Sequence, residues 1–320
     1  DQPRSRGLGD VYKRQIIRRL VFMKTIFKRF KSFGTLMLIV SVLMSTLSTT
    51  VLAQTSDGID KMPYGTSVTY NPKTGEILYG ADQHSHSNTV ALDERNVPAT
   101  YGLIGKDNRV KINNTTDSPY RTICYVEATY PDGAVSQGSG VLVYFNVMLT
   151  AGHIVYEREH GGWAKSIRVY PGKNGDNNPL GSATSTTITT NNAWISNCDH
   201  EWDWGIVDLS RKFDTWQLYG YYKNYSSQLG EQVQAIGYPG TYMYSDTNSI
   251  SSIGDRYMHT LCDWTAGESG GAIIDVKTNH LIGIMSYEHT ENGQCTYNGA
   301  VRINEDLFNR LNGHQSEVSK

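Results

Sequence analysis

Basic residues are scarce in the larger part of this sequence. The chain of 320 residues contains 29 Lys and Arg, but ten of them lie within residues 1–31. From Leu103 to the end, 16 basic residues stand against 23 acidic ones, which gives a net charge of −7. Nucleic acids and anionic membranes bind through basic surfaces. We therefore expect neither of them as a partner of this part of the chain.

Long apolar runs are also lacking. The longest candidate, Leu36–Met44, is interrupted by Ser41, whereas a membrane-spanning helix needs about 20 apolar residues. The run follows a basic stretch at 24–31 and precedes the small residues of 51–53. A basic start, an apolar centre and a small-residue cleavage site together predict a secretory signal peptide, which we place at residues 23–53. A membrane anchor is the alternative interpretation.

Cysteine is sparse, and no pair has the spacing of a metal site. The sequence contains four cysteines and no C-x-x-C motif, so zinc is not indicated and we expect no metal or other cofactor. An even number in an exported chain favours two disulfides, and four cysteines can pair in three ways. The candidates are Cys124, Cys198, Cys262 and Cys295.

The chain before residue 103 differs from the rest in composition and in its pattern of apolar residues. Residues 1–22 are basic and unpatterned and precede a methionine, so we interpret them as a non-native leader. Residues 54–102 are polar and too poor in apolar runs to bury much core. We interpret them as a propeptide or loosely folded leader, and residues 103–320 as the functional domain.

Short apolar or alternating runs characterise this domain. Runs such as 123–129, 139–149 and 233–236 are separated by turns rich in Gly, Asn and Pro. Many short strands between such turns predict an all-β barrel or sandwich. One helix is expected near the end, where Asn304 can cap it and Gly313 can end it. Its apolar face consists of Ile303, Leu307, Phe308 and Leu311.

Three short motifs in the domain contain the residue types of a nucleophilic serine site. In chain order they are Thr150-Ala151-Gly152-His153, Asp203-Trp204-Gly205-Ile206-Val207 and Gly267-Glu268-Ser269-Gly270-Gly271. A serine among glycines is by itself more often a tight turn, because glycine readily adopts positive φ. The order His, Asp, Ser changes that interpretation, because it is one of few chain orders in which a catalytic triad recurs.

A serine nucleophile needs a base and an orienting acid, so one role can be given to each motif. Ser269 would attack the carbonyl carbon, and a hydroxyl needs a base within hydrogen-bond reach to do so. His153 would take the proton and return it to the leaving amine. Asp203 would orient the imidazole and stabilise its protonated form. Asp208 is the competing acid.

These motifs, with Gly138-Ser139-Gly140-Val141-Leu142 before the histidine, resemble the chymotrypsin-like serine proteases. Residues 104–109 and 114–121 resemble the start of the mature bacterial glutamyl endopeptidases, and the resemblance covers residues 103 to about 313. It implies two antiparallel six-stranded Greek-key β-barrels, with the triad in the cleft between them. From its apolar face, we expect the C-terminal helix to pack against the second barrel. The resemblance also implies that the backbone N–H groups of Gly267 and Ser269 form the oxyanion hole.

The implied function is that of a secreted bacterial serine endopeptidase made as a zymogen. Such an enzyme would hydrolyse proteins or peptides through an acyl-enzyme, outside the cell. We expect a monomer without stable membrane association after signal cleavage. The alternative is a protease-like toxin or binding module whose active site is vestigial or narrowly used.

The resemblance places Asp263, Trp264, Met285 and Ser286 at the substrate pocket. The glutamyl endopeptidases carry a histidine on the pocket strand, where this sequence has Met285. Trypsin-like enzymes carry an acid that binds Lys or Arg at the position of Asp263, but Trp264 could shorten the pocket. A preference for acidic, basic or apolar side chains therefore stays open.

Glu268 and the cysteines depart from the glutamyl endopeptidase pattern. In chymotrypsin-like zymogens an acid before the nucleophile often pairs with a newly freed N-terminus, so Glu268 could couple leader removal to pocket formation. A solvated loop residue is the alternative. By position relative to the implied pocket, Cys262 could join Cys295, which leaves Cys124 for Cys198.

Overall fold

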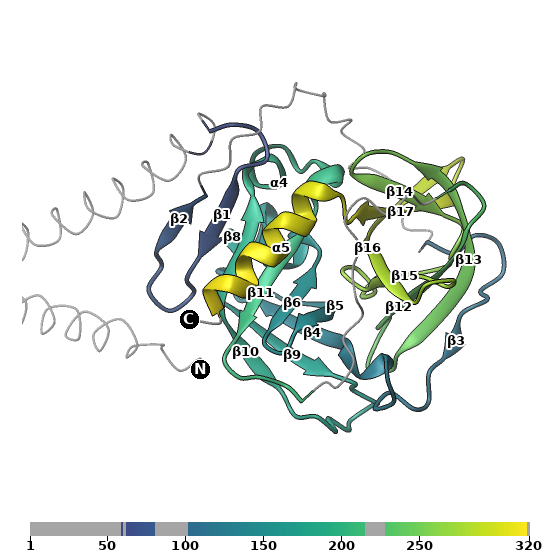
Figure 1. Ribbon diagram of the computed structural model, residues 1–320, viewed down its shortest axis with the longest axis horizontal. Helices are drawn as coiled ribbons and strands as arrows, with labels where there is room; N and C mark the ends of the chain where they lie inside the picture. The colour runs from purple at the N-terminus through teal and green to yellow at the C-terminus, as the bar shows by residue number, and fades with distance from the viewer. Residues whose placement is uncertain (1–58, 60–61, 81–101, 215–227, 319–320) are drawn as a thin grey trace, which may run out of the picture. The chain divides into compact units, whose positions relative to one another are not determined.

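The computed structural model describes residues 59, 62–80, 102–214 and 228–318, which are coloured in Figure 1. The predicted leader 1–22 and signal peptide 23–53 lie outside these ranges, as does most of the second half of the predicted propeptide. Chain contacts divide the protein after Lys61, and the following description concerns the unit from Met62 onwards. In the described ranges no helix combines the length and the apolar character needed to cross a membrane.

The first barrel is a closed antiparallel sheet in the order β11-β6-β5-β4-β9-β10, in which β10 pairs back to β11. Alternating apolar residues fill it, as in β9, where Ile167 and Val169 point inward and Arg168 is exposed. Its strands are β4 (Ile123–Thr129), β5 (Val135–Tyr144), β6 (Val147–Thr150), β9 (Ser166–Pro171), β10 (Ala183–Asn191) and β11 (Gly205–Leu209).

The second barrel is built in the same way, in the order β12-β15-β16-β17-β14-β13, and β12 closes it by pairing with β13. A short strand, β3 (Val110–Lys111), pairs with the edge of β13. Two six-stranded antiparallel barrels were expected, and the structure confirms them. The strands are β12 (Gln232–Gly237), β13 (Tyr244–Ile253), β14 (Tyr257–Thr260), β15 (Ala272–Asp275), β16 (His280–Glu291) and β17 (Gln294–Arg302).

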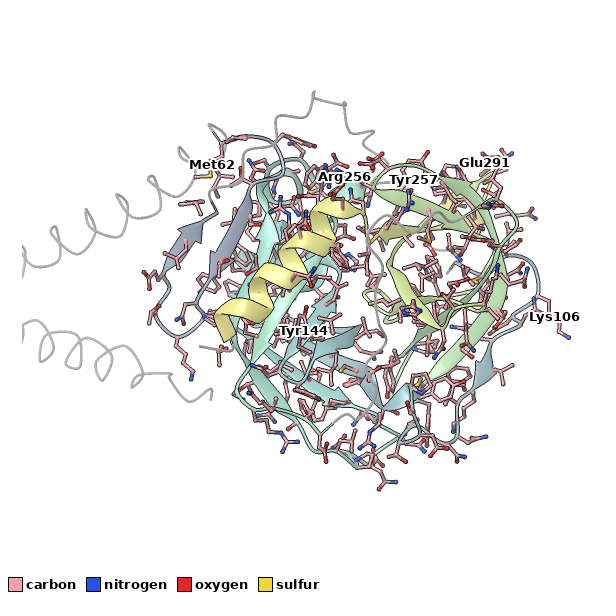
Figure 2. All side chains as sticks on the ribbon, viewed as in Figure 1. Met62, Lys106, Tyr144, Arg256, Tyr257 and Glu291 are labelled. Carbon is pink, nitrogen blue, oxygen red and sulfur yellow. The ribbon has the colours of Figure 1, made fainter. Side chains whose placement is uncertain are left out.

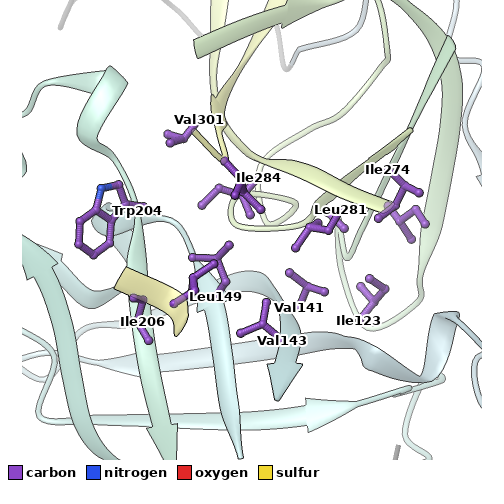
Figure 3. Packing of buried hydrophobic residues seen from close by; sticks show 14 of the residues in the cluster. Ile123, Val141, Val143, Leu149, Trp204, Ile206, Ile274, Leu281, Ile284 and Val301 are labelled. Carbon is purple, nitrogen blue, oxygen red and sulfur yellow. The ribbon is translucent and has the colours of Figure 1, made fainter. Parts of the chain in front are cut away.

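A cluster of buried apolar side chains joins the two barrels (Figure 3). Val141, Leu149 and Ile206 enter it from the first barrel, and Ile284 and Val301 enter it from the second. Burial of one such side chain contributes about 1.5–3 kcal/mol. The cluster therefore holds the two barrels against each other.

Residues 62–80 are folded, in contrast to the loosely folded leader that composition predicted. They form a hairpin of β1 (Ser67–Tyr70) and β2 (Ile77–Tyr79), and β1 extends the first sheet beyond β10. Gly75 supplies the positive φ of +74° that the connecting turn requires. Composition missed the hairpin because its stability comes from a neighbouring strand edge and from Val68, which is fully buried against the domain.

The C-terminal helix α5 (Glu305–Val318) is present and is capped as expected, since the Asn304 side chain accepts a hydrogen bond from the Leu307 N–H at 3.1 Å. It continues past Gly313, which is not among the residues with positive φ. Contrary to expectation, much of it lies against the first barrel (Figure 1). Figure 2 labels Tyr144 and Arg256 beside it, and these two residues bond to Asn312 and Asp306 of α5.

Short helices and one two-stranded ribbon complete the described secondary structure. The α-helices are α3 (Gly152–Val155) and α4 (Asn192–Asn197). The 3-10 helices are η1 (Tyr120–Thr122), η2 (Arg158–His160) and η3 (His200–Trp202). The ribbon consists of β7 (Tyr156–Glu157) and β8 (Gly162–Trp163).

Candidate active site

Paired strands of the first barrel bring His153 and Asp203 together. β6 pairs with β11 so that Thr150 lies opposite Gly205. His153 follows β6 in α3, and Asp203 directly precedes the Trp204–Gly205 step into β11. The Nδ1 atom of His153 lies 2.8 Å from Oδ2 of Asp203, and the His153 backbone N–H donates to Oδ1 at 2.8 Å. Both carboxylate oxygens of Asp203 therefore hold the histidine.

The space around this pair allows no side chain at Gly152. A Cβ there would lie 2.9 Å from Oδ1 of Asp203 and 3.1 Å from the Trp194 ring. The Trp194 ring also packs beside the His153 imidazole, with ring centroids 6.1 Å apart. The glycine of the Thr-Ala-Gly-His motif is thus required by close packing.

Burial and charge act in opposite directions on the two titratable groups. Burial alone would lower the pKa of His153, but the negative charge of Asp203 and its hydrogen bond outweigh burial and raise the pKa above 6.5. Burial alone would raise the pKa of Asp203, but His153 and the Ser286 hydroxyl outweigh it and lower the pKa below 3.8. Asp203 is 1% exposed. The arrangement favours a charged carboxylate beneath a basic imidazole.

Ser286, which the sequence placed at the substrate pocket, also belongs to this group. Its hydroxyl donates to Oδ2 of Asp203 at 2.5 Å. Ser286 lies on β16 of the second barrel, so the acid receives donors from both barrels. Asp208, the competing acid, bonds instead to Thr187 and lies 3.5 Å from His314 of α5.

The turn that carries Ser269 is anchored to the first barrel by Ser139 of β5. The Ser139 N–H donates to the Ser269 carbonyl at 2.8 Å, and its hydroxyl donates to the Gly267 carbonyl at 2.9 Å. The turn also meets the histidine segment, because a Cβ on Gly270 would lie 2.8 Å from the Ala151 nitrogen. The segment that carries Ser269 is therefore in contact with the segment that carries His153. Ser139 was not recognised as an anchor, although it lies in the Gly-Ser-Gly motif that the sequence singled out.

The backbone of the serine turn leaves two N–H groups available. The N–H groups of Glu268, Gly270 and Gly271 donate to the carbonyls of Thr265, Met285 and Glu268, at 3.0, 2.8 and 2.9 Å. Within the described part of the chain, no hydrogen bond uses the N–H groups of Gly267 and Ser269. Gly267 and Gly270 have positive φ of +91° and +80°, which glycine adopts without strain. The turn can therefore present two donors to an anionic oxygen.

Glu268 is 1% exposed, so it is not a solvated loop residue. Its carboxylate accepts a hydrogen bond from Arg109 at 2.6 Å and from the Thr265 N–H at 2.7 Å. Burial raises the pKa of Glu268 to about 7, and the Arg109 charge offsets part of that effect. The sequence suggested that an N-terminus freed by processing pairs with Glu268; in the uncut chain the partner is an internal cation. Sequence reasoning missed Arg109, which lies 159 positions away.

Asp263 is 1% exposed, and both of its oxygens accept backbone N–H groups. The donors are Ile104, at 2.7 Å, and Asn108, at 2.9 Å. The nearby Gly102 N–H donates to Glu288 of β16, and the Asn298 side chain donates to the Gly102 carbonyl at 2.5 Å. Asp263 thus anchors the start of the domain, and this use competes with binding a cationic substrate side chain.

Two other pocket candidates pack in the core of the second barrel. Trp264 is 4% exposed and Met285 is fully buried, and both belong to its apolar cluster. The Met285 methyl group occupies the space in front of Gly237 and Gly271. Met285 alternates along β16 with residues that face the other way, so it points inward.

The expected disulfides are not formed in the structure. The Cys262 thiol lies 3.5 Å from the Val233 carbonyl, and the Cys295 thiol lies 3.4 Å from the side-chain oxygen of Asn298. Cys124 is buried inside the first barrel, whereas Cys198 is the C-cap of α4. Burial raises the pKa of Cys262 to about 12 and that of Cys295 to about 11. The thiols of Cys262 and Cys295 thus contact different groups rather than each other.

Sequence comparisons find peptidases. A family model described as trypsin-like peptidase domain matches residues 138–284. A Bacillus subtilis protein named extracellular metalloprotease is 32% identical over 247 residues, which cover 75% of this chain and 76% of that protein. A Bacillus licheniformis glutamyl endopeptidase is 28% identical over 270 residues, covering 77% of this chain and 83% of that protein. Among the residues described by the structure, no group of three His, Cys, Asp or Glu is placed to hold a metal ion.

Solved structures share the fold. A Glu endopeptidase in complex with MPD superposes with a TM-score of 0.60 at 24% identity, covering 67% of this chain and 99% of that one. A thermostable serine protease from an extremophilic microorganism gives 0.54 at 17% identity, covering 61% and 97%. At these identities the likeness concerns the fold alone.

Proposed function

Because this chain is a serine endopeptidase of the trypsin-like, or chymotrypsin-like, family, we propose that Ser269, His153 and Asp203 form its catalytic triad. The observation that carries the proposal is the orientation of His153. Its Nδ1 atom is bonded to a buried carboxylate, which leaves Nε2 for the serine. The segments of Ser269 and His153 are in contact through Gly270 and Ala151.

In the proposed reaction, Nε2 of His153 accepts the hydroxyl proton as Oγ of Ser269 bonds to the substrate carbonyl carbon. The imidazolium, stabilised by Asp203, then protonates the leaving nitrogen, and the C–N bond breaks. A water molecule attacks the resulting ester with the same base, which releases the acid product and restores Ser269. The N–H groups of Gly267 and Ser269 would stabilise the oxyanion in both steps.

The proposal is tested with a fluorophosphonate probe, which reacts with activated serines. The mature protein, freed of its signal peptide and cut at the end of the propeptide, should be labelled, and Ser269→Ala should abolish labelling. Ser251→Ala removes an exposed hydroxyl from β13 and should label like the parent protein. An unlabelled parent, or labelling that survives Ser269→Ala, would contradict the assignment.

Secretion as a precursor is the second part of the proposal. It is supported by the signal-like pattern of residues 23–53 and by bacterial protease relatives, one of which is named as extracellular. Edman sequencing of the protein from the culture medium should find an N-terminus beyond residue 53. A mature chain that begins before residue 23 would contradict both the signal peptide and the non-native leader.

A protease-like binding or toxin module remains the competing function. An unreactive Ser269 in a folded, leader-free protein would favour it. The geometry of His153, Asp203 and Ser286 supports the enzyme instead, because a binding module needs no basic imidazole over a buried carboxylate.

A further inference from the structure

The hairpin of residues 62–80 pairs with β10, the strand whose end bonds to both neighbours of Asp203. β1 pairs with β10 in an antiparallel register in which Ser67 lies opposite Asn191 and Val68 lies opposite Thr190. Beyond the strand, the Asn192 side chain accepts from the Gly65 N–H at 2.7 Å, and the Asn192 N–H donates to Thr66 at 2.9 Å. The contact is thus made by backbone and buried side-chain bonds.

Trp202, the residue before Asp203, is enclosed by the hairpin on one side. Gly65 has a φ of +85°, and a Cβ on it would lie 2.0 Å from the Trp202 ring. The Tyr64 ring meets Trp202 edge-on at 5.8 Å, and the Tyr64 hydroxyl donates to Asp199 at 2.5 Å. The Arg256 guanidinium lies 3.6 Å from the centre of the Trp202 ring. The indole is held between the hairpin and a cation.

The same end of β10 holds both neighbours of the acid. The Asn191 side chain donates to the Trp202 carbonyl at 2.7 Å, and the Thr190 hydroxyl donates to the Trp204 carbonyl at 2.6 Å. Asn191 and Thr190 are the residues that face Ser67 and Val68 of β1. A displacement of the hairpin would therefore reach Asp203 from both sides.

A third contact comes from the C-terminal helix. Arg310 of α5 donates to the Gly65 carbonyl at 3.1 Å and to the Ser67 hydroxyl. The hairpin-binding face thus combines the end of β10, Asn192, Trp202 and Arg310. Arg310 is distant in sequence from the other three parts, and the hairpin bonds to β10, Asn192 and Arg310 and packs against Trp202.

We propose that the hairpin Met62–Gly80 stays bound to the hairpin-binding face, as a noncovalent part of the enzyme, after the chain is cut within residues 81–101. Bound there, it positions Asp203. The proposal rests on the leader processing proposed above. Hydrolysis of one peptide bond in that range consumes one water and yields a new carboxylate and a new amine. The contacts of the hairpin-binding face described above come from residues 64–68 of the hairpin.

The association is tested in the full chain with Ser269→Ala, into which a recognition sequence for a specific protease is inserted between residues 81 and 101. Cutting removes the high local concentration that a covalent linkage provides. The N-terminal fragment should nevertheless co-elute with the domain in size-exclusion chromatography. A fragment that separates from the parent domain at micromolar concentration overturns the proposal.

Two glycines of the same hairpin form a matched pair for this test. Gly65→Ala should release the fragment, because the methyl group would meet the Trp202 ring. Gly75→Ala introduces a comparable strain, since φ is +74°, but nothing lies within 4 Å of its Cβ. It should keep the fragment bound. Equal retention in both variants would overturn the proposed contact.

Positioning of Asp203 is read from kinetics of the cut enzyme that carries Ser269, normalised by active-site titration. Gly65→Ala should lower kcat by on the order of 10- to 100-fold, because small misplacements of catalytic groups are costly, while KM changes little. The acid limb of the pH profile should move to lower pH as His153 loses the influence of Asp203. A lower yield of active sites with an unmoved limb would show a merely structural role and contradict positioning. An inactive parent whose fragment co-elutes would instead contradict only the proposed function.

Discussion

At the residue scale, Asp203 joins His153 of the first barrel to Ser286 of the second. It receives the His153 N–H, the His153 ring and the Ser286 hydroxyl on its two oxygens. A buried carboxylate is expensive unless such donors compensate for its lost hydration. Its charge in turn raises the pKa of His153.

Asp203→Asn should therefore change the pH dependence as well as the rate. Loss of the negative charge lowers the pKa of His153, so the base stays unprotonated to lower pH, and the acid limb of kcat/KM moves down. The rate at neutral pH should fall by on the order of 10⁴-fold, because the imidazole loses its orienting partner. Stopped-flow or steady-state assays across pH 4–9 measure both effects. A limb that stays in place or moves up would show that Asp203 is not the charge acting on His153.

Asp263→Asn should affect stability rather than specificity. Its carboxylate accepts the Ile104 and Asn108 N–H groups, and an amide can accept on only one atom, so unfolding free energy should fall by about 1–3 kcal/mol. The ratio of kcat/KM for Lys, Glu and Leu at the cleaved bond should stay within about twofold, well under the tenfold that 1.4 kcal/mol would give. Asp176→Asn, at an exposed carboxylate, serves as the control. Selective loss of cleavage after Lys would instead identify Asp263 as the specificity residue.

At the element scale, α5 is fastened by charge. Asp306 bonds to Arg256 at 2.9 Å and to Arg310 at 3.0 Å. Both arginines also lie over tryptophan rings, Arg256 over Trp202 and Arg310 over Trp204. The helix therefore links Arg256 of the second barrel to the segment of the first barrel that contains Trp202 and Trp204, the neighbours of Asp203.

Asp306→Asn should make this attachment weaker and less dependent on pH. Burial works to raise the pKa of Asp306, but Arg310 and Arg256 outweigh it and hold the pKa below 3.8. A lowered carboxyl pKa contributes stability above about pH 3.8, which is lost as pH falls through the folded value. Urea unfolding at pH 7 should show that the variant loses about 1–3 kcal/mol of unfolding free energy relative to the parent. This gap between variant and parent should narrow near pH 3. Glu159→Gln, an exposed site, is the control. A gap that is the same at both pH values would contradict this account.

At the scale of the whole molecule, the apolar cluster between the barrels decides whether the site exists. The proposed nucleophile, Ser269, lies in the second barrel, whereas the proposed base and acid, His153 and Asp203, lie in the first. Alternation along β6 sends Leu149 into this cluster and Met148 into the interior of the first barrel. One strand thus serves both the barrel and its interface.

Leu149→Ala should lower the unfolding free energy by about 2–5 kcal/mol, because it leaves a cavity in a fully buried position. If the cluster couples the barrels, unfolding should remain a single transition, and probe labelling of Ser269 should disappear at the same urea concentration. Val276→Ala, at a half-exposed position, should have little effect. Labelling that is lost well before the main transition would show that the interface opens independently.

The sequence predicted the features that are written in contiguous residues. Short alternating strands, the capped helix at Asn304 and the three motifs could be recognised locally, and the barrels and the helix were confirmed. The contacts of Asp263, Glu268 and Met285 could not be foreseen, because their environments depend on Ile104, Arg109 and Gly271. The hairpin at 62–80 was missed for the same reason, since a polar strand gains stability only when an edge such as β10 is available.

The sequence by itself determined the class of enzyme, a serine endopeptidase, because the proposed nucleophile, base and acid each require a particular side chain within a short motif. Only the tertiary structure decided what surrounds them. It gave Glu268 an internal cation, used Asp263 to anchor the chain start, turned Ser286 towards Asp203 and joined the hairpin to the acid segment. The physical reason is that burial and hydrogen-bond partners are properties of residues far apart in the chain.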